Sequence, residues 1–451
     1  VADLLGMTRA QVMPALGPWD EFAVRLAGAV FLVVRWIEQA IIWIFLLGII
    51  LMSARVLVIG VLAVWQKLRQ RPPAVPGYAP PLAVLIPAYN EEAVIATTVR
   101  SVLASDYANF RVIVVDDGST DGTAALLEQE FGTDPRVTVV KRTNGGKAVA
   151  LNAAIAMVSE VAFVTIDADT SIAPTALGLL AAHLSDPKVG AVAGNAKVGN
   201  RVNLVTWFQA GEYITSQNLE RRALDVLNCI TVVPGAIGCW RTAIVRELGG
   251  FNAQTAAEDA DLTFLIRRAG FRILYEDGAL AYTEAPVTIK ALMKQRFRWS
   301  YGMVQTVWKH RDLFGRGGTL GRFALPNILI FQIILPLLGP VTDFMLLFAL
   351  GMEWFNYRSH PQSWTPDSLY RLLFFFSVLM LVDMLGSLLA FALEHKEQWT
   401  LIGGLLLQRL VYRHVMALVM FRTLKQALKG GEFHWGKLER TGKLSERFAA
   451  K

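Results

Sequence analysis

The fold class is decided by the stretch Arg111-Val112-Ile113-Val114-Val115-Asp116-Asp117-Gly118-Ser119-Thr120-Asp121-Gly122-Thr123. Its first five residues predict a buried strand, because most of them are β-branched and apolar. An acidic loop with two glycines follows, and the side chains of Asp121 and Thr123 can cap a helix that begins there. A buried strand, a polar loop and a helix in this order are typical of an α/β fold.

The alternation of strands and helices continues on both sides of this stretch. Ala83 to Pro87 predicts a buried strand, and Asn90 opens a helix that runs to about Ala104. Two further strands are expected at residues 137–141 and 162–166. The pattern predicts an α/β domain with a mostly parallel sheet.

Acidic residues follow two of these strands where each strand ends. Asp116 and Asp117 follow one strand, and Asp167 and Asp169 follow the other. Ligands of open α/β sheets bind beyond the carboxyl ends of the strands. A divalent cation held by carboxylate oxygens can neutralise a nucleotide diphosphate as it leaves, so we expect Mg²⁺ or Mn²⁺ here. The alternative is an ordinary loop of turn residues.

Two further polar elements can serve the same chemistry. Lys147 follows Asn144-Gly145-Gly146, and the amides and ammonium of this loop suit a diphosphate, although a surface loop is the alternative. Glu258 and Asp259 precede the apolar helix expected at residues 262–269. Asp259 can be the general base that takes a proton from an acceptor hydroxyl. An acidic helix start favoured by the helix dipole is the alternative.

A basic aromatic cluster lies further along the chain, at Gln295-Arg296-Phe297-Arg298-Trp299. Guanidinium groups form paired hydrogen bonds with phosphate oxygens, and an indole ring can stack on the face of a sugar. The cluster therefore predicts a contact with a diphosphate and a glycan acceptor. The alternative is the basic face of a helix at a membrane surface.

Composition indicates a membrane protein, because 54% of the 451 residues are apolar and only 18% are charged. Several apolar runs are long enough to cross a hydrocarbon core of about 30 Å. The chain is expected to consist of an N-terminal segment with an interfacial helix (1–38), a membrane helix (39–66), a catalytic domain (76–288), basic interface helices (289–316), two membrane helices (323–352 and 369–393), a re-entrant or third membrane helix (399–421) and a basic tail (422–451). Asp343 and Asp383 within these runs are candidate pore-lining groups, with buried helix contacts as the alternative.

The net charge of +7 is concentrated in residues 289–316 and in the tail. Basic segments that flank apolar runs favour the cytoplasmic face, so the catalytic domain and the tail are predicted to be cytoplasmic. No nucleic-acid-binding motif accompanies the charge, and no nucleic acid partner is expected. Cys229 and Cys239 have neither metal nor redox spacing and are expected to be small apolar residues. The chain begins with Val1 rather than methionine, so we expect it to be part of a longer protein.

In this order, the motifs Asp-Asp-Gly, Asp-x-Asp, Glu-Asp and Gln-x-x-Arg-Trp resemble those of the processive family-2 glycosyltransferases. This family includes the cellulose, chitin, hyaluronan and poly-N-acetylglucosamine synthases. The resemblance covers about Pro81 to Trp299. It implies a GT-A-type, Rossmann-like catalytic domain and an inverting, single-displacement reaction.

The resemblance also implies a role for each residue that matches a motif. The implied roles are nucleotide binding for Asp116 and Asp117, diphosphate binding for Lys147, donor and metal binding for Asp167 and Asp169 with Asp169 as the metal ligand, base catalysis for Asp259 beside Glu258, and a clamp on diphosphate and acceptor for Gln295, Arg298 and Trp299.

Other stretches resemble one branch of the family. Residues 189–195, Gly211-Glu212-Tyr213 and residues 234–241 look most like bacterial poly-N-acetylglucosamine and chitin-oligomer synthases. This likeness favours UDP-N-acetylglucosamine as donor and implies that Gly235 and Trp240 contact the acceptor. In the tail, Trp435-Gly436-Lys437-Leu438-Glu439-Arg440 resembles a Trp-Gly-Thr-Arg element that closes over bound nucleotide. The gating candidates are Trp435, Gly436, Lys437 and Arg440, although Lys437 and Leu438 replace Thr-Arg.

We therefore expect an inverting, processive enzyme that polymerises N-acetylglucosamine from UDP-N-acetylglucosamine into a β-linked polysaccharide. It would lie in the bacterial inner membrane as a multi-pass protein and pass its product across the bilayer, because a hydrated glycan cannot cross lipid without a protein path. The expected partners are the UDP-sugar, the growing glycan, the lipid bilayer, and a small membrane subunit or exporter. The alternatives are a hyaluronan, cellulose or other glucan synthase, a non-processive glycolipid glycosyltransferase, and a non-catalytic assembly or export subunit.

Overall fold

The computed structural model describes residues 18–69, 72–359, 361–362, 364–394, 397–429 and 442. The chain divides into two compact units, Val1–Arg55 and Val56–Lys451, and each is described by itself. The described residues of the first unit all belong to helix α2, which runs from Pro18 to Arg69 and so continues into the second unit. Every strand lies in the second unit, within the residues that the structure covers.

The second unit contains an eight-stranded sheet among the described residues. The strands are β1 (Leu82–Ala88), β2 (Phe110–Asp116), β3 (Val137–Lys141), β4 (Ala162–Thr165), β5 (Thr170–Ile172), β6 (Val189–Val198), β7 (Gly238–Arg241) and β8 (Arg272–Thr283). They lie in the order β3-β2-β1-β4-β7-β6-β8-β5. β1 is parallel to β2 and β4, β2 to β3, and β6 to β8, whereas β5 and β7 are antiparallel to their neighbours. The predicted α/β class with a mostly parallel sheet is confirmed.

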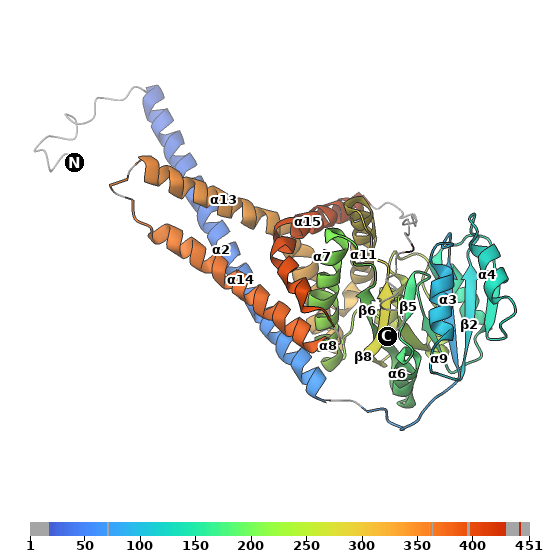
Figure 1. Cartoon of the computed structure of the whole chain (residues 1–451). Coiled ribbons are helices and arrows are strands. Elements are labelled where there is room, and N and C mark those ends of the chain that lie inside the picture. The colour runs from blue at the N-terminus through green and yellow to red at the C-terminus, as the bar shows by residue number, and fades with distance from the viewer. Residues whose placement is uncertain are drawn as a thin grey trace, which may run out of the picture. The chain divides into compact units, whose positions relative to one another are not determined.

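Helices cover both faces of this sheet (Figure 1). They are α3 (Ile95–Leu103), α4 (Thr123–Phe131), α5 (Lys147–Met157), α6 (Ala176–Ala182), α9 (Thr242–Glu247) and α10 (Glu258–Arg268). Successive side chains of a strand point to opposite faces. Leu82, Val84 and Ile86 of β1 are buried with α3, α4 and α6. Ala83 and Leu85 are buried with α5, α9 and α10, which explains why β1 is apolar at every position on both faces.

The start of one predicted helix needs correction. The helix expected at Asn90 begins instead at Ile95. Asn90 has a left-handed backbone conformation, with φ of +56°, and its side-chain oxygen accepts a hydrogen bond of 2.6 Å from the backbone N–H of Thr120. The polar residues after β1 therefore bind the acidic loop after β2 rather than forming the first turn of a helix. The expected cap is found only for Asp121, which accepts a hydrogen bond of 3.0 Å from the N–H of Thr123, where α4 begins, whereas the hydroxyl of Thr123 accepts one from the N–H of Glu91.

Among the described residues, three helices are long and apolar enough to cross a membrane, and they are Leu46–Arg69, Leu320–Ser359 and Leu369–Leu393. The first is the end of α2, and the third lies in α14 (Asp367–Leu393). The second combines short helical segments, η4 (Leu320–Ala324), α12 (Leu325–Asn327) and η5 (Ile328–Ile334), with α13 (Leu335–Ser359). Within residues 18–69 the expected interfacial helix is not separate from the membrane helix, because α2 runs without a break from Pro18 and contains no proline beyond that residue.

The last apolar run, residues 399–421, forms η6 (Trp399–Gly404) and part of α15 (Leu405–Lys429), and it is not one of these three helices. Arg413 and His414 of α15 lie 3.9 Å and 3.4 Å from the carboxylate of Asp343 on α13. Charged groups within a membrane protein normally pair with one another. For Asp343, the helix-contact alternative is therefore the one that the structure supports.

A group of helices lies between the sheet and the long helices α13 and α14 (Figure 1). It contains α7 (Leu204–Glu212), which continues through the π-helical turn η2 (Tyr213–Asn218) into α8 (Leu219–Val226), together with α11 (Ile289–Lys309) and α15. Two short 3₁₀ turns, η1 (His183–Ser185) and η3 (Arg311–Leu313), complete the helical segments of this unit.

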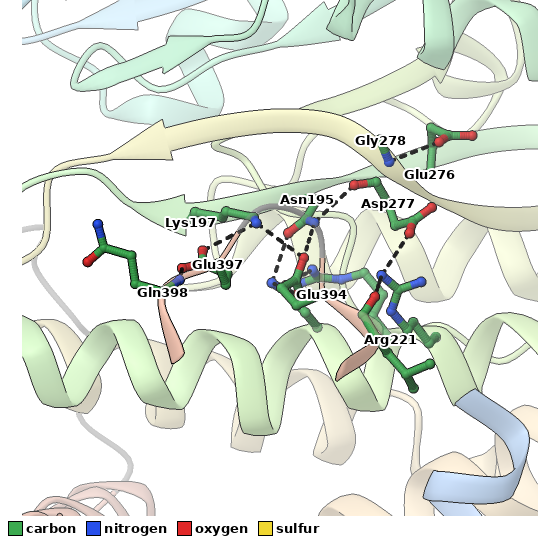
Figure 2. A network of polar contacts seen from close by, with 12 residues as sticks. Asn195, Lys197, Arg221, Glu276, Asp277, Gly278, Glu394, Glu397 and Gln398 are labelled. Carbon is green, nitrogen blue, oxygen red and sulfur yellow. Dashed lines mark hydrogen bonds and ion pairs between the residues drawn. The ribbon is translucent and has the colours of Figure 1, made fainter. Parts of the chain in front are cut away.

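Buried charges join the sheet to the end of α14 (Figure 2). The ammonium of Lys197 on β6 lies 3.3 Å from Glu394 and 3.2 Å from Glu397, and all three side chains are at most 3% exposed. Asn195 donates a hydrogen bond of 2.7 Å to Glu394, and Arg201 pairs with Glu397 at 2.9 Å. The segment that follows a predicted membrane helix is thereby fixed to the strand that crosses the catalytic domain.

Lys197→Met is expected to destabilise the protein by about 3–5 kcal/mol, because removal of one partner leaves buried carboxylates without compensation. The matched control is Lys141→Met, since Lys141 pairs with Glu128 at 2.6 Å but both side chains are about half exposed. The control should cost at most about 1 kcal/mol. Thermal unfolding in detergent measures the difference. Equal midpoints for the two variants would show that the buried cluster adds no stability.

Candidate active site

The acidic loop after β2 is held by its own backbone and by the next loop. Asp116 is 4% exposed and accepts a hydrogen bond of 3.1 Å from the N–H of Ser119. Asp117 is 2% exposed, and its carboxylate accepts hydrogen bonds from the N–H groups of Gly145 (3.1 Å) and Gly146 (2.7 Å). Asp117 therefore shapes the loop that precedes Lys147. Its nucleotide contact stays a prediction.

Lys147 is the first residue of α5 and lies near carboxylates from two other segments. Its ammonium is 2.6 Å from Asp167, after β4, and 3.2 Å from Glu258, at the start of α10. Burial lowers the pKa of Lys147, but the charges of Asp167, Glu258 and Asp259 more than offset this effect, and its pKa is raised overall. The ammonium is therefore charged at neutral pH, and its contact with a diphosphate stays a prediction.

Backbone N–H groups bind both carboxylate oxygens of Asp259 and so orient its side chain. Its Oδ2 accepts a hydrogen bond of 3.1 Å from the N–H of Gly235, and its Oδ1 accepts one of 2.8 Å from the N–H of Ala260. Burial and the neighbouring charge of Glu258 raise its pKa, Lys147 opposes them, and the resulting pKa is about 6. A carboxylate of this pKa is ionised at neutral pH and is a better proton acceptor than an ordinary aspartate.

Gly235 lies directly against this group of charges. A Cβ at this position would be 2.6 Å from the ammonium of Lys147 and 3.5 Å from Asp167. A side chain at this position would therefore push the ammonium of Lys147 away from its present place. The structure places Gly235 beside the charged groups of the site, and its contact with an acceptor stays a prediction.

The prediction that Trp240 contacts the acceptor is wrong. Its side chain has no exposed surface, and its ring N–H donates a hydrogen bond of 3.1 Å to the hydroxyl of Thr165. The indole packs at 5.6 Å against Phe251 in the core. Trp240 is part of the core between the sheet and helices α5, α9 and α10, so its side chain offers no surface to a ligand.

Asp169 lies at the junction of three segments. Its carboxylate accepts hydrogen bonds from the hydroxyls of Thr170 (3.2 Å) and Thr283 (3.3 Å), and its carbonyl oxygen accepts one of 3.2 Å from the N–H of Glu284. Glu284 in turn accepts a hydrogen bond of 3.2 Å from the N–H of Gly442, the one described residue of the tail beyond 429. Gly442 therefore lies in the neighbourhood of Asp169. Trp435, Gly436, Lys437 and Arg440 lie outside the described residues.

The basic aromatic cluster lies on α11. Gln295 is buried, whereas Arg298 and Trp299 are half-buried. The ring of Trp299 lies 6.3 Å from that of Tyr213. The same helix touches the loop before the predicted base, because Gln305 accepts a hydrogen bond of 3.0 Å from the N–H of Ala256.

The structure thus brings Lys147, Asp167 and Glu258 into direct contact, and Gly235 lies against Lys147 while its N–H binds Asp259. Arg296 was predicted only as part of the cluster whose guanidinium groups contact a diphosphate, and the structure shows it nearly fully buried and bonded to Gln295. Its residue type did not indicate this burial, because a basic residue on a helix next to a membrane is expected on the surface.

The chain is similar to several known proteins. Residues 80–302 match the family described as "Glycosyltransferase like family 2". The poly-beta-1,6-N-acetyl-D-glucosamine synthase of Staphylococcus aureus strain COL is 30% identical over 254 residues, which are 56% of this chain and 61% of that protein. The protein of the same name from Staphylococcus epidermidis is 29% identical over 222 residues, 49% of this chain and 54% of that protein. In both cases the match spans less than two thirds of the relative.

Among solved structures, a mannosyltransferase from Pyrobaculum calidifontis, in complex with GDP-Man and Mn²⁺, superimposes with a TM-score of 0.53 at 20% identity. The likeness covers 86% of this chain and 100% of that chain. It shows a shared GT-A-like fold.

Proposed function

We propose that this chain, whose residues 80–302 form a glycosyltransferase family 2 domain, is a hexosyltransferase that builds a β-linked polymer of N-acetylglucosamine from UDP-N-acetylglucosamine. The observation that carries the proposal is the contact of Lys147 with Asp167 and Glu258, beside Asp259 with a pKa of about 6. The names of the relatives support N-acetylglucosamine as the sugar and a β-1,6 linkage.

In this proposal the acceptor hydroxyl approaches Asp259. The carboxylate takes the hydroxyl proton while the acceptor oxygen attacks the anomeric carbon of the donor, and the bond to the diphosphate breaks on the opposite side. The N–H groups of Gly235 and Ala260 hold the carboxylate in place. The charge of Lys147 stabilises the negative charge that develops on the diphosphate.

The residues fit a divalent cation that is shared with the donor. Mg²⁺ sites often use one or two carboxylates together with substrate phosphates. No group of three or more protein ligands for a metal occurs in the part of the chain that the structure describes, so a complete protein cage is not what these residues offer. Asp169, with Asp167 nearby in sequence, would hold Mn²⁺ or Mg²⁺, which would neutralise diphosphate charge.

The proposed acceptor is the growing glycan, which would contact Trp299 and leave through the membrane helices. The basic segments favour a cytoplasmic catalytic domain in a bacterial inner membrane. The bond between Gly442 and Glu284 supports a tail that lies close to the donor site, where residues 435–440 would close over the nucleotide. A small membrane subunit or exporter would complete the path outward.

The test uses the purified chain in lipid vesicles, supplied with Mg²⁺ or Mn²⁺ and each of several UDP-sugars. We expect a polymer from UDP-N-acetylglucosamine that a β-1,6-specific N-acetylglucosaminidase degrades and that accumulates inside inverted vesicles. A single added sugar would indicate a non-processive enzyme. Polymer that stays wholly on the donor side would contradict translocation, and failure with every UDP-sugar would contradict the hexosyltransferase itself.

A further inference from the structure

Arg296 is a nearly fully buried cation in the half of the site where the acceptor would bind. Its guanidinium lies 4.2 Å from the ring centre of Trp299 and donates a hydrogen bond of 2.7 Å to the side-chain oxygen of Gln295. One planar group thus contacts two of the three residues that the Gln-x-x-Arg-Trp motif predicts to bind ligands. Arg296 occupies one of the motif's unspecified positions.

The guanidinium is itself fixed from outside α11. It donates a hydrogen bond of 2.6 Å to Glu212, at the end of α7, and Glu212 also accepts a hydrogen bond from the hydroxyl of Tyr412 on α15. Tyr213, the next residue after Glu212, presents its ring to both Arg296 (5.9 Å) and Trp299 (6.3 Å). Three helices therefore converge on one cation.

The guanidinium of Arg296 is positively charged at neutral pH. Burial lowers the pKa of Arg296, but the carboxylate of Glu212 more than offsets this, so its pKa is raised overall. A charged guanidinium over an indole ring is held by the ring's electron density, and its planar fork can bond two oxygens at once. A lysine at this position could keep the charge but could not bond Gln295 and Glu212 in the same geometry.

We propose that Arg296 is a positioning residue for the acceptor end of the site, which orients Gln295 and Trp299 together and is oriented by Glu212 and Tyr412. The proposal rests on the proposed function, because it assigns the acceptor to Trp299. It also makes α15 part of the support for that site, since Tyr412 lies on α15. Arg413 and His414, the next residues of α15, contact Asp343 on the membrane helix α13.

The test compares the full-length chain with Arg296→Gln, Arg296→Lys and Tyr412→Phe, using UDP-N-acetylglucosamine and a short N-acetylglucosamine oligomer. For both Arg296 variants we expect the KM for the oligomer to rise about tenfold or more, with the Kd for the donor unchanged within a factor of two. The ratio of donor hydrolysis to sugar transfer should rise together with the KM for the oligomer. Tyr412→Phe should change the same quantities in the same direction by a smaller factor, because Arg296 keeps its bond to Glu212.

Arg222→Gln is the matched control. Arg222 is also nearly fully buried, bonds a carboxylate, Asp277, at 2.8 Å, and lies 5.5 Å from an aromatic ring, that of Tyr275. It should lower the thermal midpoint without altering the KM for the oligomer. If Arg222→Gln and Arg296→Gln alter stability alike and neither alters that KM, Arg296 is only structural and the proposal is overturned.

A second readout does not depend on activity. The chain is labelled with 5-fluorotryptophan, and the ¹⁹F resonance of Trp299 is assigned from its loss in Trp299→Phe. In Arg296→Gln this resonance should shift or broaden, whereas in Arg222→Gln it should not. An unchanged resonance would contradict the positioning role. If the wild-type chain transfers no sugar but the resonance responds as expected, the proposed function fails while the support of Trp299 by Arg296 stands.

Discussion

Asp259→Asn is expected to lower kcat by a factor of about 10²–10⁴, which is the usual contribution of a general base. The amide has nearly the same shape, and its oxygen can still accept the N–H of Gly235, but it cannot take a proton. Binding of UDP to the variant, measured by calorimetry, should remain close to that of the wild type. The control is Asp134→Asn, because Asp134 pairs locally with Arg136 at 2.9 Å on the surface. Wild-type turnover in Asp259→Asn would exclude Asp259 as the base.

The pH dependence of the wild type offers an independent check on the same residue. Asp259 must be ionised to accept a proton, so kcat/KM should fall about tenfold for each pH unit below its pKa of about 6. Its pKa is raised above the ordinary value of 3.8, so the stability that its protonated form contributes is present below about pH 3.8 and is lost as the pH rises through about 6. At pH 7 the Asp259→Asn variant should therefore be at least as stable as the wild type, and lost turnover could not be blamed on unfolding.

Lys147→Met is expected to weaken donor binding roughly ten- to hundredfold, because a hydrogen bond to a charged group contributes about 1.5–3 kcal/mol. It should also move the acid limb of the pH profile to higher pH, since the charge of Lys147 lowers the pKa of Asp259. Calorimetric titration with UDP-N-acetylglucosamine and a kcat/KM profile between pH 5 and 9 measure both effects.

The control for this variant is Lys141→Met, on the neighbouring strand β3, where the lysine pairs with Glu128 at the surface. The Lys141→Met variant should change neither the Kd for the donor nor the acid limb of the pH profile. An unchanged donor Kd in Lys147→Met would show that the ammonium serves only to neutralise Asp167 and Glu258. An unchanged acid limb would show that Lys147 does not influence the base.

The strands and the acids that follow them could be predicted because their signal is local. Val137–Lys141 has the predicted bounds, and the predicted strand at Arg111 to Val115 lies inside β2. Strands buried on both faces are apolar at nearly every position, so a short apolar run before a polar loop predicts such a strand. The carboxyl ends of β1, β2 and β4 then meet at one edge of the sheet, because these strands are parallel neighbours.

The remaining features depend on partners that are remote in the sequence. Trp240 stands in a motif-like stretch, yet β7 turns its side chain into the core. Arg296 and Lys197 are basic residues that a sequence pattern places on the surface. They are buried because Glu212 lies 84 residues before the first and Glu394 lies 197 residues after the second (296 − 212 and 394 − 197).

By itself, the sequence determined the α/β class, the apolar runs, and the candidate acids with Lys147, since all of these follow from residue type and short-range spacing. Only the tertiary structure decided that Lys147 lies between Asp167 and Glu258, that the pKa of Asp259 is about 6, and that the guanidinium of Arg296 packs against the ring of Trp299. The physical reason is that burial and electrostatic interaction depend on distances in space. Those distances are set by how α5, α10, α11 and α15 pack, which short-range spacing does not specify.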